Sequence, residues 1–123
     1  MRIGTDIVEC ARIRDALQRH PEQFPKIAFT DEEIAAAPEN EAARIAYFSG
    51  RWAAKEAIAK ALGCGFGSRC AWQELTIRNL PGGAPVAELA GNALDTFRSL
   101  GAKSLQISIS HERNYATAVA LIE

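Results

Sequence analysis

The sequence has no long apolar run, no excess of one charge and no paired cysteines, and each absence excludes a class of protein. No apolar run approaches the ~18 residues of a membrane span. The 14 basic and 15 acidic side chains leave a formal charge of −1, so binding of nucleic acid through a basic surface is not expected. The three cysteines lack CxxC spacing, which predicts neither a disulfide framework nor a zinc site.

The remaining composition is typical of a globular protein. Apolar residues make up 48% and charged residues 24% of the chain, which excludes disorder and a coiled coil. A length of 123 residues predicts one domain over residues 1–123. The first residues, MRIGTD, lack the apolar core of a signal peptide. We therefore expect a cytoplasmic protein with reduced thiols and no membrane partner.

Hydrophobic patterning predicts elements in the order β-α-α-α-β-β-α-β-β. The predicted strands cover residues 2–9, 71–79, 86–89, 104–110 and 115–122. Predicted helices cover residues 10–20, a short segment after the capping-box pair Thr30 and Glu33 that ends at Pro38, and residues 41–62 and 91–101, with 21–28 as a connection. This order lacks the alternation of a doubly wound fold, so the predicted class is α+β: a small sheet of about five strands packed on the long central helix and shorter helices.

The long helix at 41–62 is the first candidate for chemistry, because apolar residues nearly encircle it while charged residues interrupt it. Its only acidic residue after the first turn is Glu56, and the basic residues give residues 42–62 a local charge of about +3. Those basic residues are Arg44, Arg51, Lys55 and Lys60. The alternative is a solvated surface ion pair between Glu56 and Lys60, four residues apart.

Asp6 and His111 are the other candidates. Asp is disfavoured in strands, and Gly4, two residues earlier on the same face as Asp6, allows a ligand or helix to approach closely. If Asp6 and Glu56 converge at ~5 Å, they repel by about 3 kcal/mol at an effective dielectric constant of ~20, and an oxygen-liganded Mg²⁺ would relieve that repulsion. Alternatively, Asp6 caps a neighbouring helix and His111, at a strand end, is a structural hydrogen-bonding residue.

The strand at 115–122 is apolar on both faces, which predicts burial on both sides. One layer of strands and four helices covers little more than one face of a sheet. The other face is expected to be an apolar patch that marks an interface, and a closed ring of subunits, three-fold for example, would cover it.

Three segments together resemble a known family: Gly4–Val8 (GTDIV), Arg51–Gly63 (RWAAKEAIAKALG), and Ser108–His111 (SISH) with Tyr115-Ala116. In order and spacing they are similar to the 4′-phosphopantetheinyl transferases, in particular the short, single-half type, the holo-acyl-carrier-protein synthases. This resemblance implies the fold of that family. It also implies Mg²⁺-dependent transfer of the 4′-phosphopantetheine arm of coenzyme A to a serine of an apo acyl carrier protein, which leaves adenosine 3′,5′-bisphosphate.

The resemblance also implies roles for individual residues and a homotrimer with three sites at subunit interfaces. Asp6 and Glu56 match the Mg²⁺ ligands, and with Lys60, which matches a basic residue near the pyrophosphate, they form the implied catalytic set. The implied coenzyme A contacts are Lys60, His111, Arg51, Gly63 and Pro85, and the implied carrier-protein contact is Arg12.

The chain departs from the family pattern at three positions. Val8 stands where fused relatives have an acidic residue, so water is expected at a third metal-ligand position. Ala84 replaces a common lysine that would contact the adenosine end of coenzyme A, and Trp52 replaces a common phenylalanine. Two alternative functions are a non-enzymatic α+β module that binds acidic carrier proteins and a metal-independent hydrolase that uses Glu56 and His111.

Overall fold

The computed structural model describes all residues from Met1 to Glu123 and has the predicted α+β architecture. In chain order the elements are β1 (Arg2–Glu9), α1 (Cys10–Arg19), α2 (Gln23–Ala28), α3 (Asp31–Ala36), α4 (Glu41–Leu62), the 3₁₀ turn η1 (Trp72–Glu74), β2 (Leu75–Asn79), β3 (Pro85–Leu89), α5 (Gly91–Ser99), β4 (Leu105–His111) and β5 (Tyr115–Ile122).

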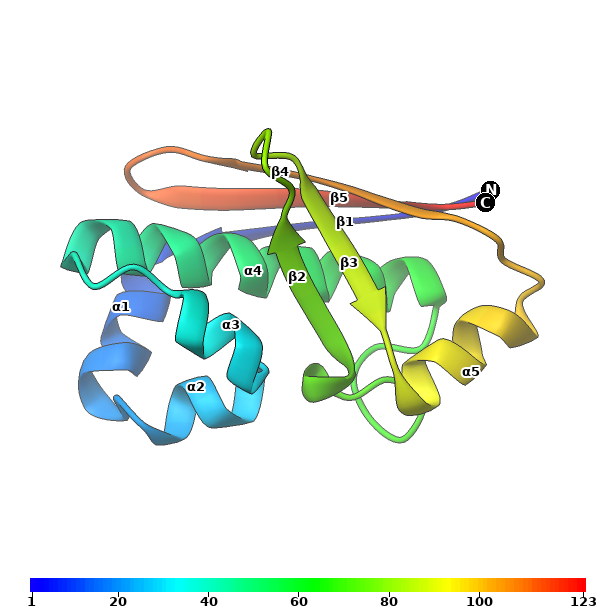
Figure 1. Ribbon diagram of the computed structural model, residues 1–123, viewed down its shortest axis with the longest axis horizontal. Coiled ribbons are helices and arrows are strands. Elements are labelled where there is room, and N and C mark those ends of the chain that lie inside the picture. The colour runs from blue at the N-terminus through cyan, green and yellow to red at the C-terminus, as the bar shows by residue number, and fades with distance from the viewer.

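The strands form two separate antiparallel sheets rather than one. The larger sheet has the order β1-β5-β4, and β2 pairs with β3 in the smaller one. The long helix α4 runs along one face of the larger sheet, and the β2–β3 hairpin crosses α4 (Figure 1). The chain termini lie together because Arg2 at the start of β1 pairs with Ile122 at the end of β5.

Small residues let α4 approach the larger sheet closely. The face of β5 toward the helix carries buried Ala116, Ala118 and Ala120. In β1, a Cβ atom on Gly4 would lie 2.0 Å from the carbonyl oxygen of Ala57 in α4. Gly4 therefore serves the approach of a helix, one of the two roles expected for it.

A buried ion pair joins α4 to the helices and hairpin on its other side. Lys55 and Glu33 side chains are both fully buried, and Lys55 Nζ lies 2.6 Å from Glu33 Oε1. The ammonium also donates to the carbonyl oxygens of Ala28 at 2.9 Å and Trp72 at 3.1 Å, and Glu33 Oε2 accepts from the Ile77 amide. Each charge thus has the hydrogen bonds that a buried ion requires.

Two sequence predictions about element boundaries are wrong. Residues 21–28 are not only a connection, because α2 covers Gln23–Ala28. Pro25 is the third residue of this helix, where its missing N–H would have no helical partner anyway. The predicted strand at 71–79 begins only at Leu75, because η1 occupies the preceding residues.

Within one chain the 115–122 strand is buried on one face only, which contradicts burial on both sides but confirms the expected uncovered apolar face. Residues 116, 118, 120 and 122 of β5 are buried against α4, whereas Tyr115 and Val119 on the opposite face are 44% and 42% exposed. Ile3 and Ile7 in neighbouring β1 lie on the same uncovered face and are 68% and 63% exposed. None of the helices is long and apolar enough to cross a membrane.

Candidate functional site

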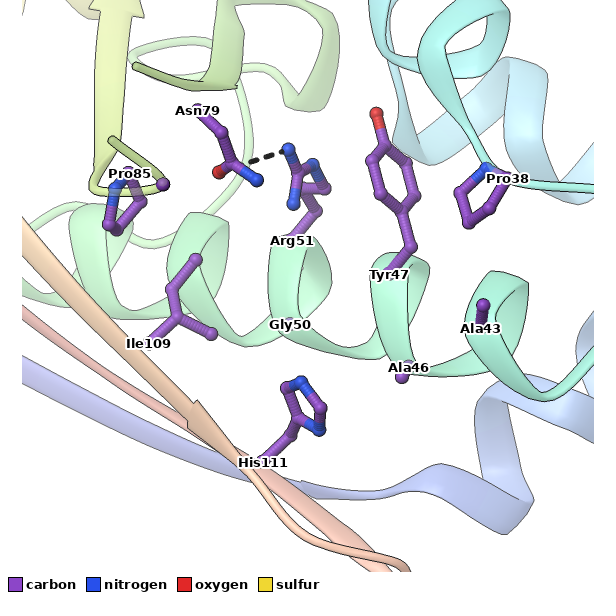
Figure 2. A pocket seen from close by; sticks show the side chains of 11 residues that line it. Pro38, Ala43, Ala46, Tyr47, Gly50, Arg51, Asn79, Pro85, Ile109 and His111 are labelled. Atoms are coloured by element: carbon purple, nitrogen blue, oxygen red, sulfur yellow. Dashed lines mark hydrogen bonds between the residues drawn. The ribbon is translucent and has the colours of Figure 1, made fainter. Parts of the chain in front are cut away.

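A pocket of about 410 Å³ lies between α4, the end of β4 and the β2–β3 turn. It brings together three residues from the predicted coenzyme A set: Arg51, Pro85 and His111. Figure 2 shows Arg51 projecting from α4, while His111 extends from β4 toward the helix. The pocket therefore combines a guanidinium with an imidazole, a set of donors suited to an anionic ligand.

Arg51 is almost completely buried, with 8% of its surface exposed, yet its donors are largely free. Its Nη2 atom donates to Asn79 Oδ1 at a long 3.4 Å, and its buried Nε has no hydrogen-bond partner. No acidic side chain lies within ion-pair distance of it. A buried cation with an unpaired donor is costly unless a ligand satisfies it, so this guanidinium is a candidate anion-binding group.

The second group of predicted residues lies on the β1 side of α4. Lys60 Nζ is 3.1 Å from Asp6 Oδ1 and also donates to the Thr5 carbonyl at 3.0 Å. The Asp6 side chain is only 15% exposed. The surface ion pair between Glu56 and Lys60, considered as an alternative from the spacing, does not form, because Lys60 turns toward Asp6 instead.

Glu56 is electrostatically coupled to Asp6. Partial burial raises the pKa of the Glu56 carboxyl, and the negative charge of Asp6 raises it further, while Lys60 and Arg12 oppose the shift. The structure therefore brings together Asp6, Glu56 and Lys60, which lie on elements fifty residues apart. Arg12, the predicted carrier contact, is near enough to Glu56 to influence its pKa.

This carboxylate pair has the chemistry of a site for a hard divalent cation. Two carboxylates suit Mg²⁺, which retains several waters when proteins bind it. No cluster of three or more His, Cys, Asp or Glu side chains is present that would hold a metal without water. Asp6 and Glu56 fit such a cation because the negative charge of Asp6 raises the pKa of the Glu56 carboxyl, and a cation removes that repulsion.

The two groups lie on opposite sides of one chain. At ~100° per residue, Glu56 and Lys60 project about 140° and 180° around α4 from Arg51. Asp6 and His111 belong to the two edge strands of the β1-β5-β4 sheet, which are separated by two strand spacings, about 10 Å. One chain thus presents a pocket on one flank of α4 and a carboxylate cluster on the other.

Gly63 belongs to neither group of side chains. It ends α4 in the left-handed region with φ of 81°, where a side chain is disfavoured. Arg2 caps the same helix end, because its Nε donates to the Ala61 carbonyl at 2.8 Å. Gly63 lies one residue beyond the last turn that carries Lys60, away from the residues that line the Arg51 pocket.

Among the lining residues that sequence reasoning missed, Tyr47 and Asn79 are the two that contact Arg51. Tyr47 had a detectable signal, because it precedes Arg51 by four residues and side chains at that spacing meet on a helix. Asn79 had none, because its contact with Arg51 depends on how the β2–β3 hairpin lies across α4.

Comparisons with known proteins agree with this fold. The family model of the 4′-phosphopantetheinyl transferase superfamily matches residues 2–120. A holo-[acyl-carrier-protein] synthase from Sulfurovum sp. (strain NBC37-1) is 42% identical over 123 residues, which cover 100% of this chain and 97% of the relative. The crystal structure of holo-[acyl-carrier-protein] synthase from Neisseria meningitidis superposes with a TM-score of 0.90 at 28% identity, covering 99% of this chain and 97% of that one. The Helicobacter pylori enzyme, in complex with coenzyme A, superposes with a TM-score of 0.84 at 31% identity, covering 98% and 99%.

Proposed function

The chain belongs to the 4′-phosphopantetheinyl transferase superfamily, and we propose that it is a holo-acyl-carrier-protein synthase. In this reaction the serine hydroxyl of an apo acyl carrier protein attacks the β-phosphorus of coenzyme A. A new phosphodiester bond forms to the serine oxygen, the bond to the α-phosphate breaks, adenosine 3′,5′-bisphosphate leaves and the serine proton passes to water. Full-length identity of 37–42% to relatives that bear the enzyme's name supports this function.

The observation that carries the proposal is the convergence of Asp6, Glu56 and Lys60 on one side of α4. Transfer of a phosphoryl group needs the charge on the phosphates neutralised and the hydroxyl oriented, with little covalent chemistry from the enzyme. Two carboxylates and an ammonium beside a partly exposed surface suit that task. The nucleophile arrives on the carrier protein, which accounts for a site with no nucleophilic motif of its own.

Asp6 and Glu56 would hold Mg²⁺. When bound there, Mg²⁺ supplies positive charge to the pyrophosphate of coenzyme A. Lys60, one helical turn after Glu56, would donate hydrogen bonds to the same phosphates. Val8, in place of an acidic residue, adds no third carboxylate to this cluster, so water would complete the coordination.

Coenzyme A is the substrate that fits the Arg51 pocket. The free donors of Arg51 and the imidazole of His111 would bind its phosphate oxygens, and Pro85 would contact the adenosine end. Ala84 places no cation on this side of the pocket, so recognition there would depend on Arg51 and His111. Gly63 would lie near the pantetheine arm at the end of α4, where the Arg2 guanidinium fills the space that a Cβ atom on Gly63 would take.

A homotrimer with shared sites accounts for the separation of the two groups. Neither flank of α4 alone holds both the carboxylates and the anion pocket, so a complete site requires the carboxylates of one subunit beside the pocket of the next. The uncovered apolar face of the β1-β5-β4 sheet, with Ile3, Ile7 and Val119, supports association. Exposed apolar patches of this kind mark interaction surfaces.

The carrier protein would approach the carboxylates from α1. Arg12 is exposed on that helix and close enough to Glu56 to affect its ionisation, so a carrier bound there would present its serine to the phosphates.

The three cysteines are free thiols, which is consistent with a protein that functions in a reducing cytoplasm.

The test is to mix the protein with coenzyme A, Mg²⁺ and an apo acyl carrier protein and to weigh the carrier by mass spectrometry. A mass gain equal to one phosphopantetheine group, dependent on Mg²⁺ and lost when the carrier serine is replaced by alanine, supports the proposal. An unmodified carrier after long incubation, with properly folded protein and a carrier accepted by a related enzyme, contradicts it.

A further inference from the structure

Tyr47 lies directly against Arg51 in the pocket that we propose for coenzyme A. Its position in the sequence does not by itself assign it a function. The guanidinium carbon of Arg51 lies 3.8 Å from the centre of the Tyr47 ring, within the range of a cation–π contact. Figure 2 shows both side chains projecting into the pocket from successive turns of α4. The Tyr47 ring therefore packs against one side of the Arg51 guanidinium.

The Tyr47 ring is itself held at its far end. Its hydroxyl donates to the backbone carbonyl of Glu33 at 2.6 Å. Burial raises the pKa of the Tyr47 hydroxyl, so it remains a neutral donor at physiological pH. Glu33 is in turn fixed by its buried ion pair with Lys55, which precedes Glu56 on α4.

We propose that Tyr47 is a positioning residue for coenzyme A binding, with its ring holding the guanidinium of Arg51 in the orientation that leaves its free donors toward the pocket. Arg51 needs such support because Asn79 supplies its only side-chain hydrogen bond, at 3.4 Å. Tyr47 itself touches no reacting atom in this scheme. The inference rests on the proposed function only in taking a coenzyme A phosphate as the ligand of Arg51.

The substitution Tyr47→Leu removes the ring but keeps an apolar side chain that favours a helix. It should weaken binding of coenzyme A about tenfold, as expected for loss of a largely desolvated cation–π contact. Tyr47→Phe keeps the ring and loses only the bond to Glu33, so it should weaken binding by about two- to threefold. In steady-state transfer, KM for coenzyme A should rise by these factors while kcat remains within about twofold of the parent value.

A double-mutant cycle separates positioning from a general packing role. Affinities for coenzyme A and for adenosine 3′,5′-bisphosphate are measured by calorimetry for the parent, Tyr47→Leu, Arg51→Ala and the double variant. If Tyr47 acts through Arg51, Tyr47→Leu costs affinity in the parent but almost none when Arg51 is already alanine. Arg44→Ala is the matched control, because it removes a cation 4.9 Å above the Phe48 ring on the same helix, outside the pocket, and should leave coenzyme A affinity unchanged.

The outcomes distinguish failure of this inference from failure of the proposed function. An equal loss from Tyr47→Leu with and without Arg51, or no loss when Arg51→Ala alone weakens binding, overturns the role of Tyr47 and leaves the coenzyme A site intact. A parent protein that binds neither ligand overturns the proposed function. If Tyr47→Leu fails to fold, the same cycle with Tyr47→Phe decides, because its smaller loss should likewise vanish when Arg51 is alanine.

Discussion

The ammonium of Lys60 lies 3.1 Å from the carboxylate of Asp6, so the cation from the end of α4 neutralises the acid from the middle of β1. A bond to the Thr5 carbonyl at 3.0 Å holds Lys60 in this position. A divalent cation on Asp6 and Glu56 would compete with this ammonium for Asp6. Lys60 would then be free to turn toward a phosphate of coenzyme A.

Replacing Lys60 with alanine should therefore affect coenzyme A binding and divalent-cation binding differently. Coenzyme A binding should weaken and transfer should slow by about 10- to 100-fold, as expected for loss of a hydrogen bond to a charged group. Binding of a divalent cation, measured with Mn²⁺ in the absence of coenzyme A, should not weaken, because the ammonium that competes with the cation for Asp6 is gone. Calorimetry of each ligand alone measures both, and an unchanged affinity for coenzyme A would return Lys60 to the role of a structural partner of Asp6.

The sequence predicted the long helix well, because local patterns determine it, whereas the convergence of Asp6 with Glu56 was implied only by the family resemblance. The asparagine cap at residue 40 and the glycine at residue 63 mark the ends of α4, and the capping box at Thr30 is present as predicted. Glu33 has one role that such local patterns predict and one that they do not. It completes that capping box and also holds buried Lys55, and only the packing of α3 on α4 reveals the second role.

Most of the missed features depend on contacts between distant segments, whereas the missed helix α2 is a local effect. Pro25 favoured a connection rather than a helix over residues 21–28, yet in the first turn of α2 it removes no helical hydrogen bond. Lys60 has the spacing to pair with Glu56, but β1 presents a closer carboxylate. Asn79 reaches Arg51 only because the β2–β3 hairpin crosses α4.

Alanine at either Asp6 or Glu56 should abolish transfer while leaving the fold intact. Each substitution removes one of the two carboxylates that would hold Mg²⁺, and neither residue is part of the buried core. We expect transfer to fall by more than about a thousandfold, with a circular dichroism spectrum like that of the parent. Asp95→Ala on α5, an exposed acid with no ion pair, is the control and should transfer normally. Near-normal turnover of Asp6→Ala or Glu56→Ala at modest Mg²⁺ would contradict the metal assignment.

Glu56→Gln should increase the stability of the metal-free protein at neutral pH. Burial and the neighbouring Asp6 raise the pKa of Glu56 in the folded state, so folding favours its protonated form. That contribution to stability is fully present below the unfolded pKa, about 4.3, and is lost as pH rises through the higher folded value. Glutamine remains neutral throughout.

Urea unfolding in the presence of a chelator measures this effect. The free energy of unfolding of Glu56→Gln relative to the parent should be higher at pH 7.5 than at pH 4. The matched control, Glu39→Gln, changes an exposed carboxylate in the loop before α4 and should show no such gain. A Glu56→Gln protein that is less stable than the parent at pH 7.5 would show that this carboxylate supports the fold.

Gly4→Ala should destabilise the protein and impair the site together. The added methyl group would lie 2.0 Å from the Ala57 carbonyl oxygen and 2.7 Å from the Ala61 amide nitrogen, both backbone atoms of α4. The helix must then move away from β1, at a cost of about 3 kcal/mol, which corresponds to a decrease in Tm of about 10 °C. Gly67→Ala, where a Cβ meets nothing within 4 Å, should melt like the parent.

Mixing two impaired variants tests whether sites are shared between subunits. Glu56→Ala damages the carboxylate side of α4, and His111→Ala damages the pocket on its other side. A shared site is therefore intact where a His111→Ala subunit supplies the carboxylates and a neighbouring Glu56→Ala subunit supplies the pocket. Random exchange at equal amounts should restore about a quarter of the sites. The control mixes Glu56→Ala with Asp6→Ala, both damaged on the carboxylate side, and should restore none. Transfer activity is measured after reversible dissociation, with subunit exchange confirmed by mass. A stable and active monomer in light scattering, or no recovery despite confirmed exchange, would place the whole site within one chain.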